Sequence, residues 1–201
     1  SYAIYTEAGR LLRAPGSGLL GPLAPQRVIA IGESQSAAFL VTYVNAVDPL
    51  ERCYDGFLIH GRSGVGARLE GGFGEPRGSS ADFWASDGHR IREDVRVPVL
   101  TFQSETDVTA LGGGRARQPD TERLRLWEVA GAAHFDTYGL LASRVDREGL
   151  SIQELAQQLA PTDRPMGMQA KEPINSGPQQ HYVLNAAFPG LERCVRDGTP
   201  P

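Results

Sequence analysis

The sequence predicts an α/β fold, with a mostly parallel sheet flanked by helices. Short apolar segments rich in β-branched and aromatic residues alternate along the chain with segments whose apolar residues recur at helical spacing. Strands that alternate with helices form parallel sheets, because each helix returns the chain to the edge where the next strand begins. The 201 residues, 40% hydrophobic and 22% charged, fit a single domain over residues 1–201.

Four segments have the character of buried strands. Each is short, apolar and bounded by Gly, Pro or Asp, as strands of a covered sheet are. They are Arg27–Ile31, Phe57–His60, Val97–Gln103 and Leu124–Val129.

Helical spacing of apolar residues appears in the segments between and after these strands. Helices are expected at Ser36–Val47, Ser151–Leu159 and Tyr182–Arg196, and residues Ser1–Arg13 have the pattern of a helix that leads into the first strand. Asp48 and Pro49 are expected to stop the helix before them, because a proline inside a helix removes a hydrogen bond.

Two long irregular stretches interrupt the alternation. Residues 61–88 are rich in Gly, Ser and Arg and are too long for an ordinary connection, so a lid-like insertion is expected there. Residues 160–177 contain several prolines and form a second irregular excursion. Trp84 in the insertion and His60 at the end of a strand are candidates for the substrate pocket, with simple packing as the alternative for each.

Composition excludes several classes of function. A net charge of −4 argues against nucleic-acid binding, and the apolar runs are far shorter than the ~20 residues that span a bilayer. The sequence has no glycine-rich phosphate-binding motif and no closely spaced metal ligands, so neither a cofactor nor a metal is expected. Cys53 and Cys194 lie far apart, and both a bridge and two free thiols are consistent with this pattern.

The strongest functional signal is the run Ile31–Ala37, of sequence IGESQSA. An apolar strand ends, Gly32 permits a tight turn, Ser34 follows and a helix begins at once, which is the context of a nucleophile elbow. The turn presents the Ser34 hydroxyl, and the backbone N–H of Gln35 is then placed to stabilise an oxyanion. Ser36 stands where the usual motif has its second Gly, and capping of the helix by Ser34 is the alternative.

An acid and a histidine follow in the order that such an elbow requires. Glu105 and Asp107 come directly after the third predicted strand, and His134 follows the fourth in a loop of Gly and Ala. His134 would take the proton of Ser34 and return it to the leaving group, while a carboxylate would fix its tautomer. Asp107 is favoured, because such a loop usually presents its acid several residues past the strand, and Glu105 is the alternative acid.

With these residues, the chain resembles the alpha/beta hydrolases, and more narrowly the bacterial group named alpha/beta hydrolase domain proteins. The resemblance rests on the stretches GESQSAAFLVTYVNAV, DGFLIHGR, VPVLTFQSETDV, RQPDTERLRLWEVAGAAHFD, INSGPQQHYVLNAAF and ERCVRDGTPP. It implies a serine hydrolase that acts on carboxylic esters, with Ser34 and His134 at the matching positions and the acid in the SETD turn.

The resemblance covers the C-terminal part of an α/β-hydrolase fold, from near residue 25 onwards. A complete fold has roughly 100 or more residues before its elbow, which supply several strands and the second oxyanion donor. Here 33 residues precede Ser34. Four strands alone would leave one sheet edge open, so an N-terminal companion segment or chain is expected to complete the fold.

Three functions are consistent with these observations. Cleavage of a small-molecule ester is the leading hypothesis, and cleavage of an amide would use the same triad. A non-catalytic interaction subunit that keeps the fold is the third. The intact Ser-acid-His series argues against that subunit, and the expected lack of a second oxyanion donor argues for it.

Overall fold

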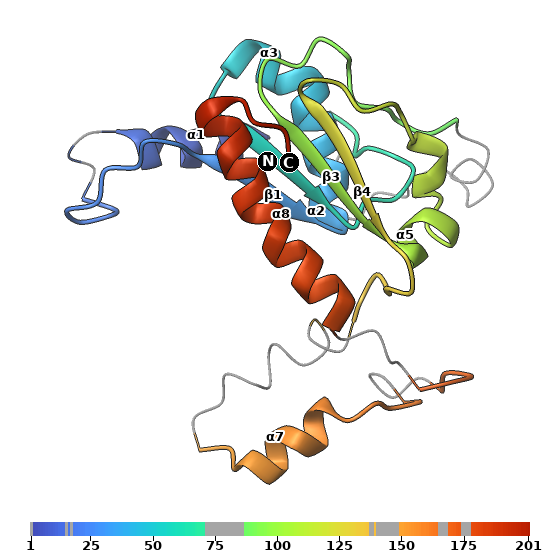
Figure 1. Cartoon of the computed structure of the whole chain (residues 1–201). Helices are drawn as coiled ribbons and strands as arrows, with labels where there is room; N and C mark the ends of the chain where they lie inside the picture. Colours follow the sequence, from blue (N-terminus) through green and yellow to red (C-terminus); the bar gives the residue numbers. More distant parts are fainter. Residues whose placement is uncertain are drawn as a thin grey trace.

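Four parallel strands form one sheet, in the order in which they occur along the chain (Figure 1). In this computed structural model they are β1 (Ile29–Glu33), β2 (Gly56–His60), β3 (Val99–Ser104) and β4 (Leu124–Val129). Each neighbouring pair is parallel, so all four carboxyl ends meet at one edge of the sheet. The predicted α/β fold is confirmed.

The structure describes residues 2–14, 16, 18–70, 87–136, 139, 149–164, 169–173 and 178–201. The predicted insertion at 61–88 and the predicted excursion at 160–177 therefore lie partly outside the described residues. The helices within the described part are α1 (Tyr2–Arg13), α2 (Gln35–Thr42), the π-helix η1 (Tyr43–Val47), α3 (Asp48–Glu51), α5 (Glu105–Thr109), the 3-10 helix η2 (Gly113–Ala116), α7 (Ile152–Leu159) and α8 (Pro178–Asp197).

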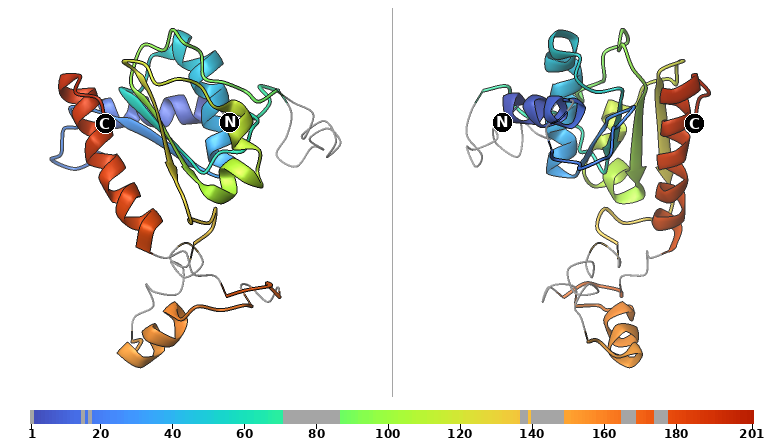
Figure 2. Two further views of the ribbon diagram at one scale, coloured as in Figure 1. Left: turned by 45° about the vertical axis from the view of Figure 1, so that its right-hand side comes forward. Right: turned by 90° about the vertical axis from the view of Figure 1, so that its left-hand side faces the viewer.

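Helices cover both faces of the sheet. Figure 2 shows α8 along one face, with α1, α2 and α3 on the other. Successive side chains of a strand point to opposite faces, and the core divides accordingly. On the α8 side, Leu58, Leu100 and Phe102 pack against Ala187 and Leu191. The other layer buries the alternate residues of the same strands under α1 and α2; its members include Ala30, Phe57, Ile59, Val99, Leu40 and Val41.

The predicted strands are all present, and β1 differs most in its bounds. The ladder begins at Ile29 rather than at Arg27 and extends through Glu33, which pairs with His60 of β2. Val28 donates its backbone N–H to the carboxylate of Asp55 instead of to a strand. The strand therefore carries the chain two residues further toward the carboxyl edge than its apolar residues suggest.

The predicted stop at Asp48 and Pro49 was wrong. α2 continues through η1 into α3, and Pro49 lies in the first turn of α3. A proline in a first turn loses no intrahelical hydrogen bond, because the N–H groups there have no partner within the helix. The helical segment ends instead at Arg52, which adopts a left-handed conformation with φ 48°.

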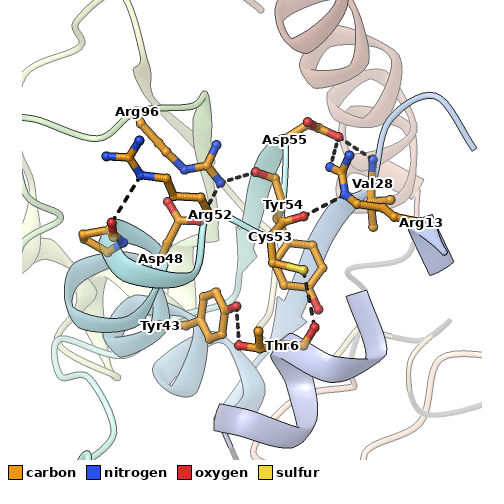
Figure 3. Close-up of polar contacts among 11 residues, drawn as sticks. Thr6, Arg13, Val28, Tyr43, Asp48, Arg52, Cys53, Tyr54, Asp55 and Arg96 are labelled. Atoms are coloured by element: carbon orange, nitrogen blue, oxygen red, sulfur yellow. Dashed lines mark hydrogen bonds and ion pairs between the residues drawn. The ribbon is translucent and has the colours of Figure 1, made fainter. Parts of the chain in front are cut away.

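Buried polar contacts fix α1 to the rest of the fold (Figure 3). The hydroxyl groups of Thr6 and Tyr43 lie 2.7 Å apart, and the Cys53 thiol donates to the Thr6 carbonyl at 3.4 Å. At the C-terminal end of α1, Arg13 donates to the Cys53 carbonyl and pairs with the carboxylate of Asp55. These contacts tie α1 to the segment that leads into β2.

Both cysteines are free and buried, so the two-thiol alternative is the one observed. Burial raises the pKa of each thiol. Protonated, enclosed thiols of this kind are weak nucleophiles.

The outer edge of β1 carries no further strand among the described residues. The Tyr5 hydroxyl donates to the Ile31 carbonyl at 3.4 Å, and the Ile31 side chain is 45% exposed. In all three views α7 stands apart from the sheet (Figures 1 and 2).

Candidate active site

A sharp turn joins β1 to α2 and centres on Ser34. Ser34 has φ 55° and ψ −114°, a left-handed backbone conformation that a non-glycine residue adopts at a cost of about 1–3 kcal/mol. Its backbone N–H donates to the His60 carbonyl at 3.0 Å, which holds the turn against β2. A Cβ atom at Gly32 would lie 2.6 Å from the Ser36 carbonyl oxygen, so the turn excludes any side chain there. The strained serine is therefore maintained by its surroundings.

Ser34, His134 and Asp107 form a continuous hydrogen-bonded series. Ser34 Oγ lies 2.9 Å from His134 Nε2, and His134 Nδ1 lies 2.5 Å from Asp107 Oδ1. Ser34 follows β1, His134 lies in the loop after β4, and Asp107 lies in α5 directly after β3, so the carboxyl edge of the sheet brings the three residues together. This is the geometry in which an imidazole takes a hydroxyl proton while a carboxylate orients it.

The carboxylate in contact with His134 belongs to Asp107, not to Glu105. Asp107 is 1% exposed, and its Oδ2 accepts hydrogen bonds from Ser104 N at 2.7 Å and from Ser104 Oγ at 2.8 Å. The bond from Ser104 N and the reciprocal bond from Asp107 N to Ser104 Oγ, at 3.2 Å, form a capping box at the start of α5. The side chain is thereby fixed so that Oδ1 faces the imidazole. Glu105 instead accepts the backbone N–H of Gly131 at 2.7 Å and so holds the loop that carries His134.

Charge around the imidazole favours its protonated form. The hydrogen bond with Asp107 raises the pKa of His134 above its usual value, and the charge of Glu33 adds to this effect, whereas burial lowers it. A raised pKa makes His134 a stronger proton acceptor.

Gln35 is the first residue of α2. The N–H groups of a first helical turn have no intrahelical acceptor and carry the positive end of the helix dipole. The backbone of Gln35 therefore offers a donor directly beside the Ser34 hydroxyl.

His60 lies on the α8 side of this edge. Its ring packs edge-on against Phe102 with 5.1 Å between centroids, and its Nε2 lies 3.5 Å from Gln180 Nε2. Burial lowers the pKa of His60, although the charges of Asp107 and Asp136 oppose the shift. His60 thus borders the site in a setting that disfavours its charged form.

Two polar residues beside these groups were not predicted from the sequence. Gln180 is 5% exposed, and its Oε1 has no hydrogen-bond partner within the described part of the chain. Glu33, the last residue of β1, lies close enough to His134 for each charge to act on the pKa of the other. Trp84, which was predicted to line the pocket, lies outside the described residues.

A cavity of about 220 Å³ opens beside the elbow, between α1 and α2 at the free edge of β1. It is lined by Tyr2, Tyr5, Ile31, Ser36, Phe39, Leu40 and Tyr43.

Within the described ranges, no group of three or more His, Cys, Asp or Glu side chains could hold a metal ion. Nor is any described helix long and apolar enough to cross a membrane.

Comparison with known families agrees with this architecture. A family model described as "Alpha/beta hydrolase domain" matches residues 1–201, the whole length of the chain. No curated protein and no solved structure matches it. Since the match spans the entire sequence and the fold is a parallel sheet flanked by helices, the chain belongs to the alpha/beta hydrolase domain family, which indicates a hydrolase-type function.

Proposed function

We propose that the protein is a serine hydrolase that cleaves carboxylic esters of small molecules. The proposal rests on the hydrogen-bonded series Ser34–His134–Asp107. Ser34 Oγ and His134 Nε2 are 2.9 Å apart, and His134 Nδ1 and Asp107 Oδ1 are 2.5 Å apart. Its members occupy the loops in which an alpha/beta hydrolase holds its nucleophile, histidine and acid.

In the proposed reaction, Ser34 Oγ attacks the ester carbonyl carbon while His134 Nε2 takes the hydroxyl proton. Asp107 stabilises the resulting imidazolium, and the backbone N–H of Gln35 donates to the oxyanion of the tetrahedral intermediate. As the intermediate collapses, His134 returns the proton to the departing alcohol, which leaves an acyl group on Ser34. Water, deprotonated by His134, then attacks the acyl group and releases the acid and the free serine.

A companion segment is part of this proposal. β1 ends the sheet with Ile31 partly exposed, and the 220 Å³ cavity lies along the same edge. We propose that a strand of the companion pairs with β1 and brings a second donor to the oxyanion. Loss of one such donor typically lowers turnover by ~10²–10³-fold. Native mass spectrometry of the protein purified from its source should find a second polypeptide or a longer chain, and a lone chain with full activity would reject this part.

Turnover of matched esters and amides tests the reaction. A p-nitrophenyl ester with a short, neutral acyl chain is expected to be hydrolysed, and Ser34→Ala should lower kcat by ~10³-fold or more. Ser151→Ala, which removes an exposed hydroxyl at the start of α7, is the matched control and should keep wild-type turnover.

The outcomes separate the alternatives. The triad could cleave esters and amides alike, because both reactions pass through a tetrahedral intermediate. Hydrolysis of the p-nitroanilide of the same acyl group at a comparable rate would therefore identify an amidase. Equal rates for wild type and Ser34→Ala with both substrates would reject the triad and favour a non-catalytic subunit.

A further inference from the structure

Glu33 is the residue immediately before Ser34 and the last residue of β1. In the register of β1 and β2 it stands directly opposite His60. Cross-strand partners project from the same face of a sheet, so Glu33 and His60 share the α8 side of the carboxyl edge. The side chain of Glu33 is half-buried there, and burial raises its pKa.

Glu33 and His134 both border the position that a side chain at Gly61 would occupy. A Cβ atom on Gly61 would lie 3.5 Å from Glu33 Oε1 and 3.4 Å from both Nδ1 and Cε1 of His134. Gly61 also has φ 62°, a conformation that favours glycine. With no side chain at this position, the carboxylate of Glu33 and the imidazole of His134 border the same space with no Cβ atom between them.

Several titratable groups surround His134. Asp107 at the start of α5 is hydrogen-bonded to it, Glu33 of β1 acts on it by charge, and His60 of β2 lies near enough to be affected by its charge. Two other nearby carboxylates are occupied by backbone groups, since Glu105 accepts the N–H of Gly131 and Asp136 accepts that of Gly139. Among the residues that the structure describes, none donates a hydrogen bond to the Glu33 carboxylate, which acts on His134 by its charge.

We propose that Glu33 is a positioning residue that acts on His134. The carboxylate of Glu33 stabilises the imidazolium that forms when His134 takes the proton of Ser34. The inference rests on the proposed function. When His134 takes the proton, its ring gains a positive charge that both Asp107, hydrogen-bonded to Nδ1, and Glu33 attract. Asp107 acts through a hydrogen bond that also sets the tautomer, and Glu33 acts through charge alone.

The titration of His134 tests this inference without requiring turnover. The protein contains four histidines, so the imidazole resonance of His134 can be assigned by its loss in His134→Gln. Glu33→Gln removes the charge and keeps the shape, and it is expected to lower the pKa of His134 by about half a unit to one unit. Glu33→Asp, which keeps the charge, should retain most of the wild-type pKa. Glu93→Gln removes an exposed carboxylate in the loop that leads into the opposite end of β3 and should leave the pKa unchanged.

Kinetics give a second readout. The acid limb of kcat/KM for a neutral ester should move to lower pH in Glu33→Gln by the same amount, while in Glu33→Asp it should stay near the wild-type position. An unchanged pKa of His134 in Glu33→Gln, or an equal fall in Glu33→Asp, would overturn the inference. A shifted titration in a protein without any turnover would support the charge coupling and reject the hydrolase function.

Discussion

Ser34 and His134 are separated by 100 positions in the sequence, yet Ser34 Oγ and His134 Nε2 lie 2.9 Å apart. The parallel sheet explains this proximity, because the loops after β1 and β4 leave the same edge. The strained conformation of Ser34 turns its hydroxyl toward the imidazole, and the bond between Glu105 and Gly131 holds the loop that delivers His134. Substitutions at the residues that build the turn, orient the imidazole and fix α1 are therefore expected to have separate effects.

Asp107 and Glu105 are expected to respond very differently to loss of charge. Asp107→Asn should lower kcat by about 10⁴-fold, because it disturbs the tautomer and removes the charge that supports the imidazolium. Glu105→Gln should lower kcat by less than about tenfold, since it weakens one hydrogen bond to Gly131. Steady-state hydrolysis of a neutral ester by both variants measures the difference. Comparable losses in the two variants would mean that the acid has been assigned wrongly.

The pH dependence of kcat/KM should show the raised pKa of His134. His134 accepts a proton only when it is neutral, so activity falls as the pH drops through its pKa. Because the hydrogen bond with Asp107 and the charge of Glu33 raise that pKa, the midpoint of the acid limb is expected above the ordinary histidine value of about 6.5. A pH–rate profile with a midpoint at or below that value would contradict the electrostatic account of the site.

Gly32→Ala is expected to disturb the elbow. The added Cβ would lie 2.6 Å from the Ser36 carbonyl oxygen, so the backbone of the turn must shift. The free energy of unfolding should fall by about 1–3 kcal/mol, as for other overpacked sites, and kcat should fall with it. Thermal unfolding and ester turnover measure both effects. Ser36→Ala adds no atom to the same turn and should unfold at the wild-type temperature; a stable, fully active Gly32→Ala would show that the turn is not as tight as described.

Thr6 and Tyr43 should show energetic coupling. Their hydroxyl groups form a buried pair at 2.7 Å, so either Thr6→Val or Tyr43→Phe leaves one buried polar group unsatisfied, at a cost of about 1–3 kcal/mol. The double variant leaves neither unsatisfied and should lose less than the two single variants together. Chemical denaturation of the four proteins completes the cycle, and strictly additive losses would show that the contact does not fix α1.

The sequence was sufficient to predict the sheet because the strand segments are apolar and clearly bounded. β4 has the predicted bounds, whereas β1 is displaced by two residues. The displacement arises because pairing with β2, and not hydrophobicity, decides that Glu33 belongs to the strand and Arg27 does not. The continuation of α2 through η1 into α3 was likewise missed, because Pro49 falls in the first turn of α3, where a proline does not end a helix.

Within the site, the order in which a serine, two acids and a histidine follow successive strands was enough to identify Ser34, His134 and the candidate acids Glu105 and Asp107. The sequence favoured Asp107 over Glu105 only by its distance from the strand, because the capping box at Ser104 that directs the Asp107 carboxylate inward becomes visible only in the structure. Glu33 could have been found from strand alternation, which places it on the same face as Ile31. Gln180 could not, since its position depends on how α8 lies against the sheet.

Labelling with a fluorophosphonate shows whether Ser34 is the nucleophile. The folded protein is expected to take up one phosphonyl group per chain, located on Ser34 by peptide mapping, and Ser34→Ala is expected to take up none. A wild-type protein that keeps its circular dichroism spectrum but remains unlabelled, or that is labelled at another residue, would contradict the assignment of Ser34 as the nucleophile.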